Sequence, residues 1–209
     1  MEVNQFEENN YVIVKEAISL ELANFCNEYF LLKRKVVEQM NFAKIISPYV
    51  NYLGTWGDAQ APNTYSHYSD FAMETLLKKL KPMMEAATGR ELYENYSYAR
   101  IYKYGDILHR HKDRFSCEIS TTLNLGGDPW PIYLDPTGGT KNEGVEVNLR
   151  PGDMLLYKGN ILEHWRYVFT GNYCSQVFLH YNDKKTEGAE DNKYDSRPFL
   201  GLPSCYVKK

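Results

Sequence analysis

Apolar residues recur at helical intervals in the first 90 residues of the chain. One helix is predicted from Ser19, a suitable N-cap, to Val37, with apolar positions at Leu22, Phe25, Cys26, Phe30, Leu32, Val36 and Val37. A second is predicted from Asp70 to Ala87, ends at Gly89, and has apolar positions at Phe71, Leu76, Leu77, Leu80 and Met84. Both helices are amphipathic, so we expect them to support another layer of structure.

The remaining segments of this first part are less regular. A short strand is expected at 11–14, before the first helix. Residues 44–69 combine glycines and prolines with aromatic residues such as Trp56, which predicts a long loop. Because loops of this length in compact proteins usually have a function, we expect a lid or a substrate wall.

From about residue 91 the apolar pattern changes to a period of two. Short strands are predicted at 93–102, 119–125, 130–134, 145–149, 154–157 and 176–181. Turn sequences separate them, at Gly126–Pro129, Asp135–Gly139 and Pro151–Asp153. Many short strands with such turns and few helices between them favour an antiparallel sandwich. The expected fold is therefore α+β with a predominantly β core, a double-stranded β-helix or jelly roll with supporting N-terminal helices.

Length and composition fit one folded domain. The 209 residues divide into helical support and lid (1–90), jelly-roll core (91–181), and a polar loop with a C-terminal tail (182–209). A net charge of -3 gives no electrostatic basis for binding nucleic acid, so none is expected as a partner. Eighteen tyrosines favour β structure.

The cysteines and the N-terminus bear on the compartment. Four scattered cysteines form no CxxC pair and no disulfide framework, so buried thiols are expected at Cys26, Cys117, Cys174 and Cys205. We find no leader pattern and no apolar run of membrane-spanning length. A cytoplasmic protein without membrane contact is the expectation.

One polar stretch, residues 102–113, carries the candidate chemistry. His111 and Asp113 are two positions apart, so on a strand both side chains point to the same face and can share a metal ion. Two histidines and one carboxylate form a face that suits non-haem Fe(II) and leaves coordination positions open. His164 is the best third ligand, because the turn at 151–153 leads through one strand into the next and could return it to His111. His67 lies in the predicted loop, and His180 is expected to be a surface or structural barrel histidine.

A lone HxD pattern is weak evidence for a metal site, but the motifs around it strengthen that evidence. Tyr102–Gly105 gives YxxG, HxD follows six residues beyond the glycine, and a PGD turn and the distal His164 come later. Over residues 92–181 the chain thus resembles the iron(II)/2-oxoglutarate-dependent oxygenases, in particular the prolyl 4-hydroxylase-like branch. The resemblance implies that His111, Asp113 and His164 are both the iron ligands and the catalytic centre, that Tyr102 binds the 2-oxoglutarate carboxylate, and that O2 is consumed.

The chain departs from the family pattern at one point. The pattern usually places a basic residue nine or ten positions after the distal histidine, to pair with the far carboxylate of 2-oxoglutarate, but here Tyr173 and Cys174 stand there. We assign that role to Arg166, two residues after His164, with Gln176 as an additional donor. The alternative for Arg166 is a surface arginine on a strand edge.

The resemblance implies hydroxylation of an unactivated C–H bond in a small-molecule or peptidyl substrate, with a prolyl or other amino-acid side chain as one candidate. Asp113 favours this reaction over halogenation, since related halogenases replace the carboxylate with a small residue. Arg114 and Glu118 could line the substrate mouth or form a surface salt bridge. One alternative is a non-catalytic cupin-like barrel that binds a metal or a small molecule. Another is a metal oxygenase without 2-oxoglutarate, although such sites resemble three-histidine centres and Asp113 disfavours them.

Overall fold

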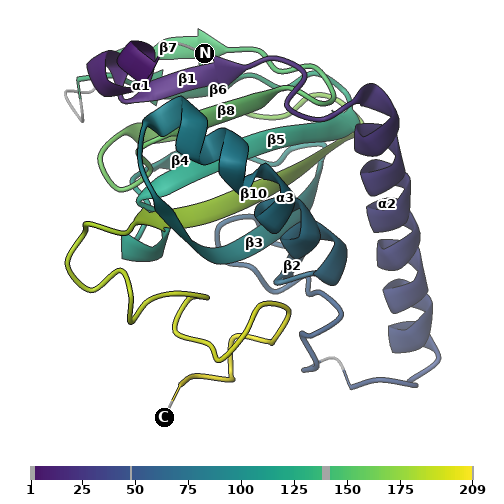
Figure 1. The fold of residues 1–209 in the computed structure, drawn as a ribbon. Helices are drawn as coiled ribbons and strands as arrows, with labels where there is room; N and C mark the ends of the chain where they lie inside the picture. Colours follow the sequence, from purple (N-terminus) through teal and green to yellow (C-terminus); the bar gives the residue numbers. More distant parts are fainter. Residues whose placement is uncertain (1–2, 48, 138–141, 209) are drawn as a thin grey trace.

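Two antiparallel sheets face each other in the computed structural model, which describes residues 3–47, 49–137 and 142–208 (Figure 1). The larger sheet has the order β1 (Tyr11–Val14), β8 (Met154–Tyr157), β5 (Ile119–Gly127), β10 (Tyr173–Asp183), β3 (Leu92–Lys103) and β2 (Tyr65–Tyr68). The smaller has the order β4 (Leu108–His111), β9 (Glu163–Arg166), β6 (Ile132–Asp135) and β7 (Val145–Val147). From β3 to β10 the chain passes repeatedly from one sheet to the other, with β6 and β7 together in the smaller sheet, which confirms the predicted jelly roll.

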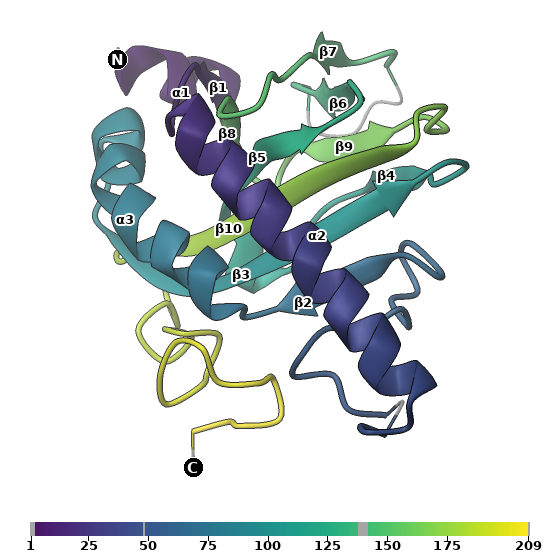
Figure 2. The same ribbon diagram turned by 90° about the vertical axis from the view of Figure 1, so that its right-hand side faces the viewer.

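Helices cover the outer face of the larger sheet, as Figures 1 and 2 show for α2 (Leu20–Phe42) and α3 (Phe71–Thr88). The Ser19 hydroxyl accepts a hydrogen bond from the Leu22 amide, and the Asp70 carboxylate accepts from the second and third residues of α3. Gly89 ends α3 in the left-handed conformation at φ 67°, which favours glycine. A short helix α1 (Val3–Asn9) and a 3₁₀ turn η1 (Phe115–Cys117) were not predicted.

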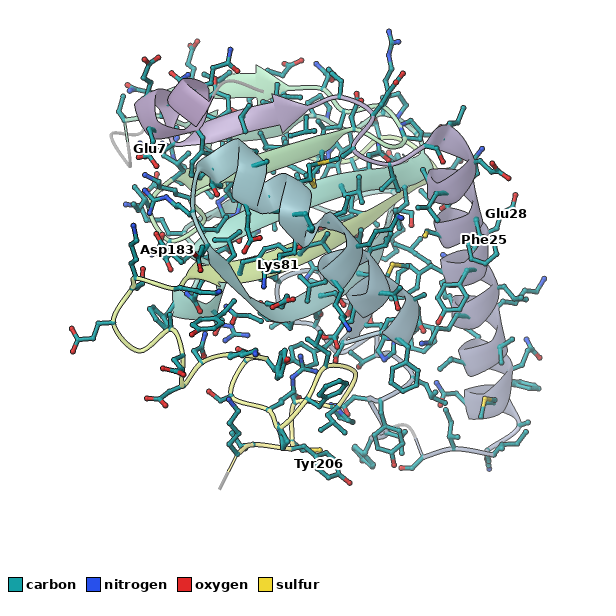
Figure 3. All side chains as sticks on the ribbon, in the orientation of Figure 1. Glu7, Phe25, Glu28, Lys81, Asp183 and Tyr206 are labelled. Atoms are coloured by element: carbon teal, nitrogen blue, oxygen red, sulfur yellow. The ribbon has the colours of Figure 1, made fainter. Side chains whose placement is uncertain are left out.

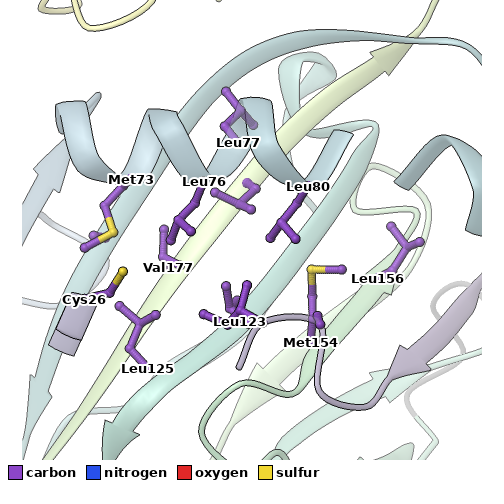
Figure 4. Packing of buried hydrophobic residues seen from close by; sticks show 14 of the residues in the cluster. Cys26, Met73, Leu76, Leu77, Leu80, Leu123, Leu125, Met154, Leu156 and Val177 are labelled. Carbon is purple, nitrogen blue, oxygen red and sulfur yellow. The ribbon is translucent and has the colours of Figure 1, made fainter. Parts of the chain in front are cut away.

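The main apolar core lies between these helices and the larger sheet (Figure 4). Helix α3 contributes Met73, Leu76, Leu77 and Leu80, and the strands beneath it contribute Leu123, Leu125, Met154, Leu156 and Val177. A fully buried aliphatic side chain stabilises a fold by about 1.5–3 kcal/mol relative to an exposed one. This layer therefore fixes the larger sheet from outside and leaves its inner face for the site.

The buried face of α2 differs from the predicted one. Ala23, Cys26, Phe30 and Val37 are buried, whereas Phe25, Leu32 and Val36 are exposed. Figure 3 labels Phe25 and Glu28, and Phe25 is 64% exposed. The reason is that α2 contacts the sheet along a narrow stripe, so neighbouring apolar positions face solvent.

Other sequence predictions need correction. The expected loop 44–69 ends in a strand, because β2 pairs with β3 along the sheet edge. Residues 182–197 are not simply exposed: Asn182, Asp183 and Arg197 are buried, and the Arg197 guanidinium pairs with Glu74 on α3. Gly138 and Gly139 of the predicted turn lie outside the described residues. Among the helices that the structure describes, none has the length and apolarity to cross a membrane.

Candidate functional site

The three predicted metal ligands converge at one end of the smaller sheet. His111 is the last residue of β4 and pairs across the sheet with His164 of β9. The Asp113 Oδ1 atom lies 3.6 Å from the Nε2 atoms of both histidines, and the candidate ligand atoms of all three lie within 4.8 Å of one another. One detail of the prediction is wrong: Asp113 lies beyond the end of β4, so strand alternation alone does not align it with His111.

Backbone hydrogen bonds set both imidazoles for metal binding. His111 Nδ1 lies 2.7 Å from the His109 carbonyl oxygen, and His164 Nδ1 lies 3.1 Å from that of Leu162. Since a carbonyl only accepts, each Nδ1 carries the proton and each Nε2 has a lone pair that can bind a metal. Burial is the main cause that lowers the pKa of His164, which keeps this ring in the neutral form that ligates metals. The donor set thus fits a divalent first-row metal.

Asp113 is held in place by the turn between β8 and β9 and by Ser120. Its backbone amide donates to the Gly159 carbonyl oxygen at 2.9 Å, and its Oδ2 lies 3.3 Å from the Ser120 hydroxyl. A Cβ on Gly159 would collide with this same Oδ2, and would come within 2.5 Å of the Cys117 carbonyl oxygen and 2.8 Å of Ser120 Oγ. Glycine is therefore required here so that the chain can approach the carboxylate closely.

A cavity of about 540 Å³ opens over the three ligands. Alternate side chains of β3 form one wall, because residues two apart on a strand share a face; they are Tyr96, Tyr98, Arg100 and Tyr102. Asp58 and Gln60, from the loop before β2, line the same cavity and are hydrogen-bonded to side chains of this wall. The Gln60 Oε1 accepts from Arg100 at 3.0 Å, so its amide nitrogen is the donor that lies 3.0 Å from His111 Nε2.

Tyr102, which was predicted to bind 2-oxoglutarate, lies on the wall of this cavity. The side chain is buried on the cavity wall, and its hydroxyl oxygen accepts a hydrogen bond from Arg100 at 2.9 Å. That acceptance leaves the Tyr102 proton available to an oxygen atom of a ligand. Tyr104, two residues further along the chain, is 73% exposed.

Arg166 is buried, not on a surface edge. Only 1% of it is exposed, and its guanidinium donates to the Trp130 carbonyl oxygen and, at 3.4 Å, to the Thr122 hydroxyl. No carboxylate of the described residues forms an ion pair with it. Burial lowers the pKa of this guanidinium, while Cys174 is the first of the neighbours that oppose the shift.

Arg166 lies near Cys174, the position at which the family pattern expects a basic residue. Each of the two side chains affects the pKa of the other, although they belong to strands of different sheets, β9 and β10. The Arg166 guanidinium lies over the Trp130 ring, 5.0 Å from its centroid, and the cavity-lining residues Tyr102 and Tyr157 also affect its pKa. Gln176 donates to the Cys174 sulfur and accepts from Thr122, so in this structure it does not contact Arg166.

The other candidates lie in different surroundings. His180 is buried on the cavity wall with Nδ1 2.9 Å from the Ser120 hydroxyl, and burial lowers its pKa to about 4. His67 belongs to a buried group with Lys33 and Asp70, away from the three ligands. Arg114 lines the cavity and also pairs with Asp195.

Sequence reasoning did not find Asp58, Gln60, Arg100 or Ser120. Arg100 carried a usable signal, since it shares the strand face of Tyr102 by alternation. The other three depend on how loops and distant strands fold back, which spacing along the chain does not encode.

Comparisons with known proteins show the fold. No family profile and no curated protein sequence matches the chain. Among solved structures, it is similar to a prolyl-4-hydroxylase from Pseudomonas putida, at 13% identity and a TM-score of 0.57, covering 87% of this chain and 97% of that one. It is also similar to the non-haem alpha-ketoglutarate-dependent epimerase SnoN of nogalamycin biosynthesis, at 13% identity and a TM-score of 0.63, covering 87% and 81%.

A third similar structure is HygX from Streptomyces hygroscopicus with nickel and 2-oxoglutarate bound. It is 12% identical with a TM-score of 0.59, covering 88% of this chain and 86% of that one. All three comparisons extend over more than four-fifths of each chain. The jelly roll of the 2-oxoglutarate/Fe(II) oxygenases is therefore the fold of this protein.

Proposed function

We propose that the protein is an Fe(II)- and 2-oxoglutarate-dependent oxygenase that hydroxylates an unactivated C–H bond. The observation that carries the proposal is the triad of His111, Asp113 and His164, in which both Nε2 atoms lie 3.6 Å from one carboxylate oxygen on the lining of a cavity. The fold shared with the prolyl-4-hydroxylase, SnoN and HygX supports it. A centre of three protein ligands leaves positions for a co-substrate and O2.

The chain's own groups would orient the iron and keep the site dry. Gly159 and Ser120 hold Asp113, while the carbonyl groups of residues 109 and 162 hold the two rings. Bound Fe(II) supplies the redox chemistry that couples oxidative decarboxylation of 2-oxoglutarate to C–H oxidation. Buried aromatic side chains such as Tyr157 line the cavity and exclude water.

Arg166 and Tyr102 would bind 2-oxoglutarate. A guanidinium that is fully buried without a carboxylate partner is costly, and an anionic ligand would offset that cost. The Tyr102 proton would donate to the same ligand. The far carboxylate would meet Arg166 beside Cys174, where related chains are expected to supply a basic residue of their own.

The substrate would be oxidised on the other side of the triad, between β3 and the loop of Asp58 and Gln60. An amino-acid side chain, free or in a peptide, fits the prolyl-4-hydroxylase likeness. SnoN is an epimerase, and HygX has also been crystallised with hygromycin B, so this fold accepts other chemistry and other small molecules. A cupin-like protein that binds metal without turnover is the second candidate, favoured only by the missing basic residue after His164.

Anaerobic spectroscopy tests the proposal. Adding Fe(II) and then 2-oxoglutarate should produce the weak visible charge-transfer band of the chelate, and the band should be absent in His111→Ala. His109→Ala is the matched control, because that ring is exposed and keeps its backbone carbonyl. Succinate formation on admitting O2 separates the oxygenase from the cupin-like alternative. Absence of the band in the wild-type protein would contradict the assignment.

A further inference from the structure

Arg100 is a buried cation on the wall of the cavity. It lies on β3, which pairs with β10 on one side and β2 on the other, and it is 3% exposed. Its guanidinium donates to the Tyr102 hydroxyl oxygen at 2.9 Å, while its buried Nε has no partner among the described residues. The strand thus holds the group rigidly, with donor capacity to spare.

The anion that this cation binds comes from a loop. The Asp58 carboxylate accepts from Arg100 and from the Tyr98 hydroxyl. Asp58 stands between two exposed residues, Gly57 and Ala59, in a segment without regular secondary structure. Burial raises the pKa of Asp58, but Arg100 and Tyr98 outweigh this effect and the net pKa is lowered. A loop therefore supplies the carboxylate, and a strand inside the sheet supplies the groups that bind it.

The charges around this pair favour an anionic ligand. Apart from the metal ligand Asp113, Asp58 is the one acidic side chain among the described residues that line the cavity. Arg100, Arg114 and Lys112 line the same cavity. Arg114 is neutralised by Asp195, whereas Lys112 has no ion pair with a described residue. Once Asp58 moves aside, the substrate half of the cavity has a net positive charge.

We propose that Arg100 and Tyr98 form a carboxylate-binding subsite, that Asp58 fills it in the resting protein, and that the substrate is a carboxylic acid that displaces Asp58. The body of the substrate would lie against the rings that surround the subsite, which are Tyr68, Tyr96, Tyr98 and Phe178. Gln60 would move together with Asp58, two residues away on the same loop. The inference rests on the proposed function only in calling the ligand a substrate.

Isothermal titration tests the subsite with two matched probes, phenylacetate and its uncharged analogue phenylacetamide. The protein is first saturated with Ni(II) and 2-oxoglutarate, so that the probe carboxylate cannot enter the co-substrate site. Phenylacetate should bind the wild-type protein about tenfold more tightly than the amide, as expected for one charge-assisted hydrogen-bonded contact. In Asp58→Ala the affinity for phenylacetate should rise further, because the internal competitor is gone.

Arg100→Gln should remove the preference for the acid, and circular dichroism checks that the variant folds. Amide hydrogen exchange at residues 57–61 of the wild-type protein should speed up with phenylacetate and not with phenylacetamide.

Equal binding of the two probes to Asp58→Ala would overturn the subsite. A preference for the acid in Asp58→Ala but not in the wild-type protein would overturn displacement, because Asp58 would then be a permanent partner. Failure of Ni(II) and 2-oxoglutarate to bind would count against the proposed function alone, since the probes can then be titrated into the metal-free protein.

Discussion

Arg166→Met should separate the effect of the buried guanidinium on the stability of the fold from its effect on 2-oxoglutarate binding. Burying an unpaired charge costs several kcal/mol, and methionine removes that cost with a similar volume. The loss of the donor to the Trp130 carbonyl oxygen leaves that acceptor unsatisfied, which costs about 1–3 kcal/mol. The metal-free variant should therefore be as stable as the wild-type protein or up to about 2 kcal/mol more stable. Urea unfolding measures this difference.

Binding of 2-oxoglutarate should change in the opposite direction. Removing one partner of a buried, hydrogen-bonded charge pair costs about 2–5 kcal/mol, so affinity for 2-oxoglutarate should fall by at least about 30-fold. Titration of 2-oxoglutarate into the Ni(II)-loaded variant measures the loss. The reasoning thus requires a gain or no change in stability together with a loss of ligand affinity.

Arg197→Met is the matched control. Arg197 is also 1% exposed, but it pairs with the buried carboxylate of Glu74. Its removal leaves that carboxylate unpaired and should cost about 3–5 kcal/mol of stability, with no effect on 2-oxoglutarate binding. If Arg166→Met were equally destabilising and still bound 2-oxoglutarate normally, Arg166 would be a structural residue and the assignment would be wrong.

Two further predictions concern groups around the ligands. Gly159→Ala should weaken Co(II) affinity by about 10- to 100-fold through displacement of Asp113, and unchanged affinity would show that the turn can relax. Although burial raises the pKa of Asp195, hydrogen bonds from Arg114, Ser116 and Tyr68 lower it to about 2 from the usual 3.8. Its stabilisation is therefore complete above about pH 4 and is lost toward pH 2, so Asp195→Asn should be up to about 2 kcal/mol less stable than wild type at pH 7. A stability difference that stays constant from pH 6 to pH 3 would contradict this.

Local patterns were enough to predict most of the helices and strands, and to select the three residues that converge in the structure. Segments in which apolar residues alternate with a period of two predicted the strands, and β8 has the expected bounds, residues 154–157. The caps Ser19 and Asp70 and the stop at Gly89 were also correct, because each depends on a few adjacent residues. His111 and His164 were found because turn sequences define where the strands reverse.

Features that depend on distant contacts were not predictable in the same way. The exposure of Phe25 follows from how α2 crosses the sheet, and its periodicity carries no information on that angle. Asp58 reaches Arg100 only because the loop folds back over the cavity. The proximity of Arg166 to Cys174 requires two strands from opposite sheets to face each other, which no spacing in the chain reveals.

The pairing of His111 with His164 across two strands connects metal binding to the stability of the fold, and therefore to the amount of the protein in the cell. An ion bound by both residues joins β4 to β9, so it would act as a cross-link within the smaller sheet. A ligand present at 100 times its dissociation constant stabilises the folded state by about 2.7 kcal/mol. Because a change of about 1–2 kcal/mol can alter abundance several-fold, supply of the metal would regulate how much of this protein survives proteolysis as well as how fast it works.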